Sequence, residues 1–126
     1  MRVIDTSAWI EWTADTAVGR RLAPYLAERG ACLVPTIVQL ELAKFMQREV
    51  SEEAAETMLA YTCECEVVPL DAARAVLAAD LCRSHRLATA DAIVYATAVE
   101  REVELVTCDA HFRGLPGVLF YAPREQ

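Results

Sequence analysis

Short apolar runs that suit β-strands alternate with longer stretches of helical periodicity along this chain, and this alternation constrains its fold more than any other feature. Strands separated by helices are joined by long crossovers, and crossovers of this kind connect parallel strands. The pattern therefore predicts an α/β fold of three layers (α/β/α), with a mostly parallel central sheet of about five strands. The expected strands are Arg2–Asp5, Ala31–Val34, Cys65–Leu70, Glu104–Thr107 and Val118–Tyr121.

Residues that commonly cap helices mark where the intervening helices begin. The expected caps are Thr6 or Ser7, Thr36, Ser51, Asp71 and Thr89, and a further helix is expected from Thr16 to about Arg29, ending at Gly30. The helices that begin at Thr36, Asp71 and Thr89 are expected to run to Arg48, His85 and Glu102.

The chain shows no repeat, low-complexity segment or linker, so residues 1–126 are expected to form a single domain. Its hydrophobic fraction of 55% is high, and we expect part of this surplus to be covered in a homodimer or by a partner. No apolar run approaches the roughly 18 residues that a membrane span needs. Asp5 stands where a signal peptide would be apolar, so we expect a cytoplasmic protein without membrane contact.

The net charge of −7 argues against a protein that coats nucleic acid by bulk electrostatics. It remains compatible with chemistry on nucleic acid at a single metal site, because bound cations invert the local field. It also suits a basic protein partner. The five cysteines are irregularly spaced and contain no CxxC pair, so we expect reduced, mostly buried thiols rather than a zinc site or disulfides.

Four acidic residues stand out by their position in this pattern. Asp5 ends the first expected strand, and Asp109 comes just after the fourth. Asp91 lies in the first turn of a helix, and Glu41 lies within an apolar helix. The carboxyl ends of parallel strands meet at one edge of a sheet, where ligands bind in open α/β folds. The sequence thus predicts that Asp5 and Asp109 point toward the same edge of the sheet, and the four acids would share a pocket if Asp91 and Glu41 converge with them.

Each acid also has an ordinary structural interpretation when taken alone. Asp91 could complement a helix dipole, and Asp109 could be a turn residue. Glu41 could pair with Lys44, although Leu40, Leu42 and Ala43 around it indicate that part of its helix face is buried. Four converging carboxylates would repel one another unless cations entered, and hard oxygen ligands of this kind select Mg²⁺ or Mn²⁺.

The segments that carry these acids resemble the PIN-domain nucleases, in order and over nearly the whole chain. They are Val3–Ser7, Leu40-Glu41, Thr89–Ala98 and Leu105–Phe112, of which the last two are the most specific. The short, single-domain form resembles the VapC toxins of toxin–antitoxin pairs.

The resemblance implies a PIN-like fold in which Asp5, Glu41, Asp91 and Asp109 hold Mg²⁺ or Mn²⁺ directly or through water. It also implies that Ser7 supports the metal site and that Thr107 orients the fourth acid. The implied reaction is endonucleolytic cleavage of single-stranded RNA by a metal-activated water, leaving a 5′-phosphate and a 3′-hydroxyl. The implied partners are a cognate antitoxin, the RNA substrate and a second copy of the chain.

Several further residues are candidates for contacts. Arg83, Arg86 and His111 are possible substrate contacts, although Arg83 and Arg86 could equally neutralise a helix C-terminus. Trp12, Phe45 and Met46 could line a groove for an apolar antitoxin segment, with core packing as the default for a tryptophan. His85 and His111 could also form an acid–base pair for metal-free cleavage, a less favoured alternative.

Two other classes of function stay open from the residues alone. One is a non-catalytic binding module on the same fold, which the intact acids disfavour. The other is a metal-dependent phosphatase or phosphotransfer enzyme that uses Asp5. A haloacid-dehalogenase-like enzyme would need an aspartate where this chain has Ser7, and a receiver domain would need a lysine after its last strand, whereas the sole lysine is Lys44.

Overall fold

A single parallel sheet organises the computed structural model, which describes residues 1–123. The strand order is β3-β2-β1-β4-β5, and every neighbouring pair is parallel. The expected sheet of about five mostly parallel strands is confirmed. The strands are β1 (Arg2–Ile4), β2 (Cys32–Pro35), β3 (Glu66–Val68), β4 (Glu104–Thr107) and β5 (Val118–Phe120).

Helices fill every connection between the first four strands, so the chain alternates as the sequence predicts. Two short 3₁₀ turns, η1 (Arg29–Ala31) and η2 (Ala110–Phe112), complete the described elements. The α-helices are α1 (Thr6–Thr13), α2 (Ala17–Ala27), α3 (Thr36–Glu49), α4 (Glu52–Cys63), α5 (Ala72–His85) and α6 (Thr89–Arg101).

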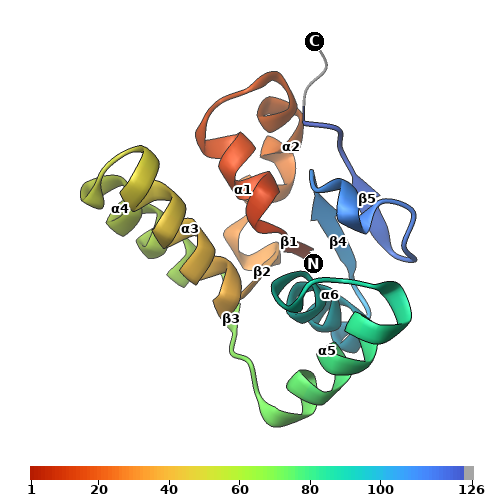
Figure 1. The fold of residues 1–126 in the computed structure, drawn as a ribbon. Helices are drawn as coiled ribbons and strands as arrows, with labels where there is room; N and C mark the ends of the chain where they lie inside the picture. The colour runs from red at the N-terminus through yellow and green to blue at the C-terminus, as the bar shows by residue number, and fades with distance from the viewer. Residues whose placement is uncertain (124–126) are drawn as a thin grey trace.

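The direction of the crossovers places the helices in two layers. From β1 the chain steps outward to β2 and then to β3, and it then returns across the sheet to β4 on the far side of β1. Right-handed crossovers put α1–α4 on one face and α5 and α6 on the other. Figure 1 shows the α3–α4 and α5–α6 pairs on opposite sides of the central strands. The order reverses between β1 and β4, and such a switch point leaves a crevice at the carboxyl ends of the strands.

The central strands are buried on both faces, which explains why they are continuous apolar runs rather than alternating ones. Val3, Ile4, Leu105 and Val106 are all fully buried. The core extends into both helical layers through Trp9 and through the almost wholly buried face of α6. Asp5 and the residues after β4 are therefore attached to the most rigid part of the molecule.

Three of the expected helix starts are confirmed by their capping hydrogen bonds. The side-chain oxygens of Thr16, Ser51 and Asp71 accept from backbone N–H groups one turn into α2, α4 and α5. The expected end of α2 at Gly30 is too late, because the helix ends at Ala27 and Gly30 lies within η1.

The other three expected caps are wrong by one residue. Thr6, Thr36 and Thr89 are the first helical residues, and the cap positions are Asp5, Pro35 and Ala88, none of which makes a side-chain capping bond. The extended backbone that a cap requires falls on the preceding residue in each case. In α1, the hydroxyls of Thr6 and Ser7 donate to acids instead.

A close helix crossing fixes α1, the helix that carries Thr6 and Ser7. A Cβ atom added at Gly19 of α2 would lie 2.1 Å from the backbone oxygen of Glu11, so only glycine allows this approach. The five cysteines are free, with Cys32 and Cys108 buried. In the part of the chain that the structure describes, no helix is long and apolar enough to cross a membrane.

Candidate functional site

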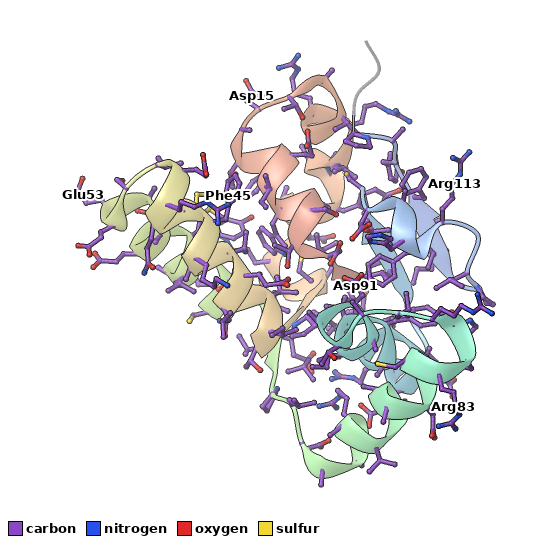
Figure 2. The ribbon with its side chains drawn as sticks, viewed as in Figure 1. Asp15, Phe45, Glu53, Arg83, Asp91 and Arg113 are labelled. Atoms are coloured by element: carbon purple, nitrogen blue, oxygen red, sulfur yellow. The ribbon has the colours of Figure 1, made fainter. Side chains whose placement is uncertain are left out.

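The four predicted acids line one pocket of about 350 Å³ at the switch point of the sheet. Asp5 follows β1 and Asp109 follows β4, and these strands are paired in register through Ile4 and Val106. Asp91 enters from the first turn of α6, where Figure 2 labels it, and Glu41 enters from α3. The structure thus brings together acids from four separate segments of the chain.

Asp5 is the most enclosed of these acids, with 4% of its surface exposed. Its Oδ2 accepts from the hydroxyls of Ser7 and Thr107, each at 2.8 Å. Burial raises the pKa of Asp5, the two hydroxyl hydrogen bonds lower it, and the charge of Asp109 raises it further. The net shift is upward, so the ionised carboxylate is disfavoured until a cation compensates it.

The hydroxyls of Ser7 and Thr107 tie the ends of β1 and β4 together. The Ser7 hydroxyl accepts from the backbone N–H of Cys108 at 2.9 Å, and that of Thr107 accepts from the backbone N–H of Asp109 at 2.9 Å. Thr107 therefore contacts Asp5 and also the backbone of Asp109. This arrangement holds both strand-end acids at a fixed separation without neutralising either.

Asp91, Asp109 and His111 form the narrowest part of the cluster. One possible ligand atom from each lies within 4.8 Å of the other two. His111 Nδ1 is 3.0 Å from Asp109 Oδ1 and 3.7 Å from Asp91 Oδ2. Burial raises the pKa of Asp91 to about 6, aided by the charges of Asp109, Asp5 and Glu41 and opposed by His111. The carboxylates are close enough to repel one another.

Glu41 is held from the α1 side rather than by its own helix. Its Oε1 accepts from the Thr6 hydroxyl at 2.6 Å, and within residues 1–123 it forms no ion pair with Lys44. The expectation that part of this helix face is buried is confirmed, since Glu41 is partly buried and Leu42 fully buried, although Leu40 is 52% exposed and turns outward. The solvated Glu41–Lys44 pair is thereby excluded as the explanation for Glu41.

The chemistry of the donors fits a divalent cation. The acidic part of the pocket offers carboxylate and hydroxyl oxygens, and no cysteine lines it. Magnesium and manganese prefer hard oxygen ligands, while zinc in a structural site would require sulfur or several histidines. Asp5 and Asp91 have a raised pKa and form no ion pair with an arginine or lysine among the described residues, so a bound cation would stabilise their ionised forms.

Of the three residues predicted to contact substrate, one lies at the acids and two lie away from them. His111 lies at the acids, as its position two residues after Asp109 indicates. Arg83 lies exposed near the end of α5, 3.2 Å from Asp80, and Arg86 follows that helix in a left-handed conformation. Neither arginine lines the acid pocket. The basic residues that do line it, Lys44 and Arg48 of α3, were missed by the sequence analysis.

The three residues expected in an antitoxin groove are divided between two environments. Phe45 and Met46 line an apolar cavity of about 310 Å³ between α1, α3 and α4. Trp12 instead packs edge-on against Trp9 and tilted against Tyr61, with ring centroids 5.8 Å and 5.2 Å away. An antitoxin contact at these residues stays a prediction.

A larger hollow of about 570 Å³ lies at the opposite edge of the sheet and contains none of the four acids. Its polar residues include Arg2 and Glu104, whose side chains already pair at 3.0 Å. Charged side chains are thus paired in the larger hollow, whereas carboxylates of like charge meet in the acid pocket.

Fold and site together define an α/β/α protein with an acidic pocket at the switch point of a parallel sheet. The PIN domain family matches residues 2–118, which is most of the chain. The chain belongs to the PIN-domain family. The expected PIN-like fold is thereby confirmed.

Solved structures with the same fold cover nearly the whole chain. A toxin–antitoxin complex from Klebsiella pneumoniae aligns with a TM-score of 0.81 at 21% identity, covering 100% of both chains. VapC20 of Mycobacterium tuberculosis, a sarcin–ricin loop cleaving toxin, aligns with a TM-score of 0.76 at 19% identity, covering 94% of this chain and 97% of that one.

A DNA-bound VapBC complex from Salmonella typhimurium aligns with a TM-score of 0.69 at 17% identity, covering 95% and 96% of the two chains. At these identities the likeness concerns the fold. No curated protein sequence is similar enough to count as a relative.

Proposed function

We propose that this chain is a Mg²⁺- or Mn²⁺-dependent endoribonuclease that acts in the cytoplasm as the toxin of a type II toxin–antitoxin pair. The observation that carries the proposal is the convergence of Asp5, Glu41, Asp91 and Asp109 in one pocket. Burial, reinforced by the charges of the other three acids, raises the pKa of Asp91 to about 6, which is the electrostatic condition of a site completed by a cation.

Asp5, Asp91 and Asp109 are the proposed ligands of the ion, and Glu41 would bind it directly or through water. When bound, Mg²⁺ or Mn²⁺ supplies Lewis-acid chemistry that polarises a phosphodiester and activates water as its nucleophile. Cleavage of the bond to the 3′ oxygen would leave a 5′-phosphate and a 3′-hydroxyl.

The residues around the acids fix their positions before any ligand arrives. The hydroxyls of Ser7 and Thr107 donate to the same oxygen of Asp5 and so restrict rotation of its carboxyl group. The Thr6 hydroxyl restrains Glu41 in the same way. Preorganisation of this kind supports catalysis because little reorganisation is needed during the reaction. His111 can donate from its ring to Asp109 or to a phosphate oxygen nearby.

The assignment as a toxin is supported by the fold shared with solved toxin–antitoxin proteins over at least 94% of the chain. The apolar cavity at Phe45 and Met46 would take an apolar side chain of the cognate antitoxin. Exposed apolar side chains such as Leu70 and Val76 support the proposed homodimer. Sedimentation at micromolar concentration that showed only monomer would argue against the dimer.

The nuclease is tested with purified protein and a 5′-labelled single-stranded RNA, in Mg²⁺, in Mn²⁺ and with chelator. We expect cleavage only with metal, 5′-phosphate ends, and no cleavage by Asp91→Asn. Asp80→Asn removes an exposed aspartate of α5 and serves as the matched control. The toxin role predicts that expression arrests bacterial growth for the wild type and Asp80→Asn, and not for Asp91→Asn.

The two alternatives give distinct results in the same assay. A non-catalytic module would bind RNA in Mn²⁺ without cutting it. A phosphatase would hydrolyse a phosphate monoester and leave the RNA intact. Wild-type cleavage that persists unchanged in Asp91→Asn would overturn the assignment of the site.

A further inference from the structure

The acid pocket has a second, oppositely charged end that its acidic residues do not explain. Lys44 and Arg48 line the same pocket as the four carboxylates. The chain has a net charge of −7, so two basic side chains in an acidic pocket are unusual. They change the electrostatic potential from negative at the acids to positive at Lys44 and Arg48. A metal-binding end and a cationic end therefore adjoin within one depression.

Helical geometry places these basic residues in line with Glu41. Lys44, Phe45 and Arg48 follow Glu41 by three, four and seven residues, which puts all of them on one face of α3. At 1.5 Å per residue, Glu41 and Arg48 are about 10 Å apart along the helix axis. The face thus runs from the acids to Arg48 in two helical turns.

Two apolar side chains also line the pocket. Ile10 of α1 and Phe45 of α3 line the pocket together with the charged residues. Figure 2 labels Phe45 on α3 and Asp91 at the start of α6, the two sides that the pocket joins. The guanidinium carbon of Arg48 lies 5.7 Å from the centre of the Phe45 ring. In a single-stranded nucleic acid, a base can stack on an aromatic ring while a neighbouring cation binds its phosphate.

Both basic side chains are available to a ligand. Lys44 is exposed and forms no ion pair within residues 1–123. The Arg48 side chain is 64% exposed, and its Nε lies 2.7 Å from Glu49 of the same helix, a surface pair that contributes little to stability. Arg83, by contrast, lies on α5 outside the pocket.

We propose that Lys44 and Arg48 bind the phosphate backbone of single-stranded RNA where the strand leaves the acid pocket along α3. The proposal rests on the endoribonuclease function and extends it by assigning the backbone contacts to this face of α3 rather than to Arg83 and Arg86. The occupant follows from charge complementarity and from continuity with the acids, since a strand cut at the acids continues on both sides of the cut.

Binding is tested in the Asp91→Asn background with 5′-fluorescein oligo-uridine, by anisotropy at several salt concentrations. The test variants are Lys44→Gln and Arg48→Gln, and Arg83→Gln and Arg86→Gln are matched controls of the same charge change. Each lost phosphate contact on a single strand lowers the slope of log K against log salt by about 0.7, which corresponds to about fivefold weaker binding at 0.1 M salt. Lys44→Arg is expected to retain binding.

A kinetic measurement separates binding from chemistry. In the metal-loaded protein that retains all four acids, Lys44→Gln and Arg48→Gln are expected to raise KM and leave kcat nearly unchanged. Far-UV circular dichroism melts verify folding, which exposed substitutions should not disturb. A fall in kcat with unchanged KM would contradict a role in binding the strand.

The outcomes distinguish this inference from the function on which it rests. If the wild type cleaves RNA and the α3 variants match the α5 controls in affinity and salt slope, the inference is overturned and the nuclease stands. If the wild type neither binds nor cuts RNA, both are overturned. If poly-glutamate competes as well as oligo-uridine and loses affinity in the same variants, the face binds acidic polypeptide, and the RNA assignment is wrong.

Discussion

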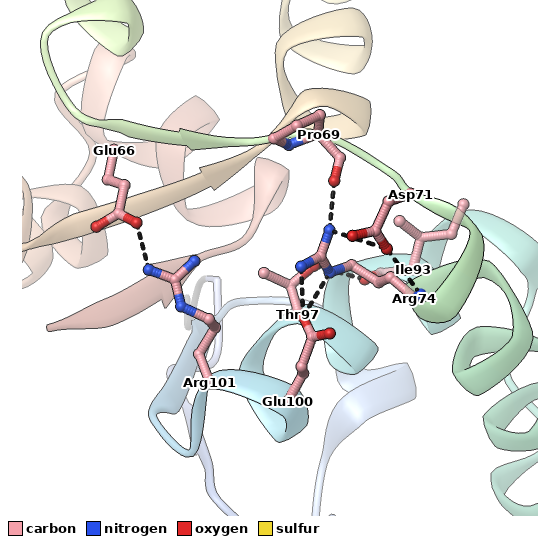
Figure 3. A network of polar contacts seen from close by, with 8 residues as sticks. All are labelled: Glu66, Pro69, Asp71, Arg74, Ile93, Thr97, Glu100 and Arg101. Carbon is pink, nitrogen blue, oxygen red and sulfur yellow. Dashed lines mark hydrogen bonds and ion pairs between the residues drawn. The ribbon is translucent and has the colours of Figure 1, made fainter.

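Two regions of the molecule hold charged side chains away from water, and they differ in whether opposite charges are paired. Around Arg74, which is 7% exposed, opposite charges meet (Figure 3). Its Nε donates to Glu100 at 2.9 Å, another nitrogen donates to the carbonyl of Pro69, and Asp71 lies 3.7 Å away. In the acid pocket, four carboxylates converge, with only His111 beside them and two basic residues at the rim.

The difference shows which charges serve the fold and which await a ligand. The Arg74 network joins the segment after β3 to α5 and α6, and its partners satisfy the buried guanidinium. In the acid pocket, burial and the neighbouring carboxylates raise the pKa of Asp5 and Asp91, and the hydroxyls and His111 beside them offset this only in part. Disrupting the Arg74 network should therefore lower the stability of the folded protein, and removing a charge from the acid pocket should raise it.

The largest effect is expected from breaking the Arg74 network. Arg74→Met keeps much of the side-chain volume and leaves Glu100 and Asp71 without their cation. Glu100 and Asp71 are 34% and 60% exposed, so water compensates them in part. We therefore expect the free energy of unfolding to fall by about 2–4 kcal/mol, somewhat less than for a fully buried pair. Urea unfolding measures this loss.

The matched control for Arg74→Met is Arg83→Met on the same helix. Arg83 is 77% exposed and pairs only with Asp80, so its replacement should change the unfolding free energy by less than about 0.5 kcal/mol. Equal effects of the two substitutions would show that the Arg74 network contributes no special stability.

The next largest effect is expected from completing the charged cluster with a cation. Mg²⁺ or Mn²⁺ at 100 times its dissociation constant should stabilise the folded state by about 2.7 kcal/mol. Thermal melts with and without metal measure the shift. Arg74→Met should respond by the same increment because it shares no partner with the acids, whereas Asp91→Asn should respond less. A wild-type melting temperature that is insensitive to either metal would contradict the proposed site.

A smaller effect is expected when one charge is removed from the acid pocket of the metal-free protein. The folded pKa of Asp91 is about 6 against a model value of 3.8, so above pH 6 its ionised form destabilises the fold. Asp91→Asn should then be more stable than wild type by about 1–2 kcal/mol, discounted from the full shift because the side chain is 21% exposed.

The pH dependence follows from the sign of this shift. As the pH falls from about 6 to about 4, folded Asp91 takes up its proton before the unfolded chain does, so wild-type stability rises and the advantage of Asp91→Asn disappears. Below that range both states are protonated and the contribution is constant. Asp80→Asn should show no such trend. An advantage that grew toward pH 4 would mean that Asp91 is not under repulsion.

The meeting of Asp5 and Asp109 could be predicted from the sequence because it depends on strand direction alone, whereas the place of Glu41 and Asp91 beside them was expected from the family resemblance. Parallel strands end at one edge, so Asp5 and Asp109 were expected together, and His111 follows from its place beside Asp109. Thr107 could be expected between the two strand-end acids for the same reason. Expectations that depend only on strand direction and on short sequence separations thus agree with the structure.

What could not be predicted depends on how helices rotate against one another. Arg83 and Arg86 were the expected basic contacts, whereas Lys44 and Arg48 line the acid pocket, because no local sequence pattern shows which face of α3 turns toward the acids. Likewise, Arg74 and Glu100 are 26 residues apart, and no local pattern joins them. The helix caps expected at Thr6, Thr36 and Thr89 are wrong by one residue, because the extended backbone falls on the preceding residue in each case. Two of these preceding residues, Pro35 and Ala88, are not preferred side-chain caps.

The smallest effect is expected from a second ion pair that lies beside the Arg74 network. Arg101 pairs with Glu66 of β3, yet the two side chains are 31% and 42% exposed, so water already screens them. Arg101→Met should therefore lower the unfolding free energy by no more than about 1 kcal/mol, and a double-mutant cycle with Glu66→Gln isolates the pairwise energy. Both arginines join elements around α6 (Figure 3). The two ion pairs thus lie in nearly the same part of the fold and differ mainly in how buried they are. A pairwise energy for Arg101 that equalled the loss in Arg74→Met would mean that burial does not govern the stability of either cluster, and the contrast between the Arg74 network and the acid pocket would then need another cause.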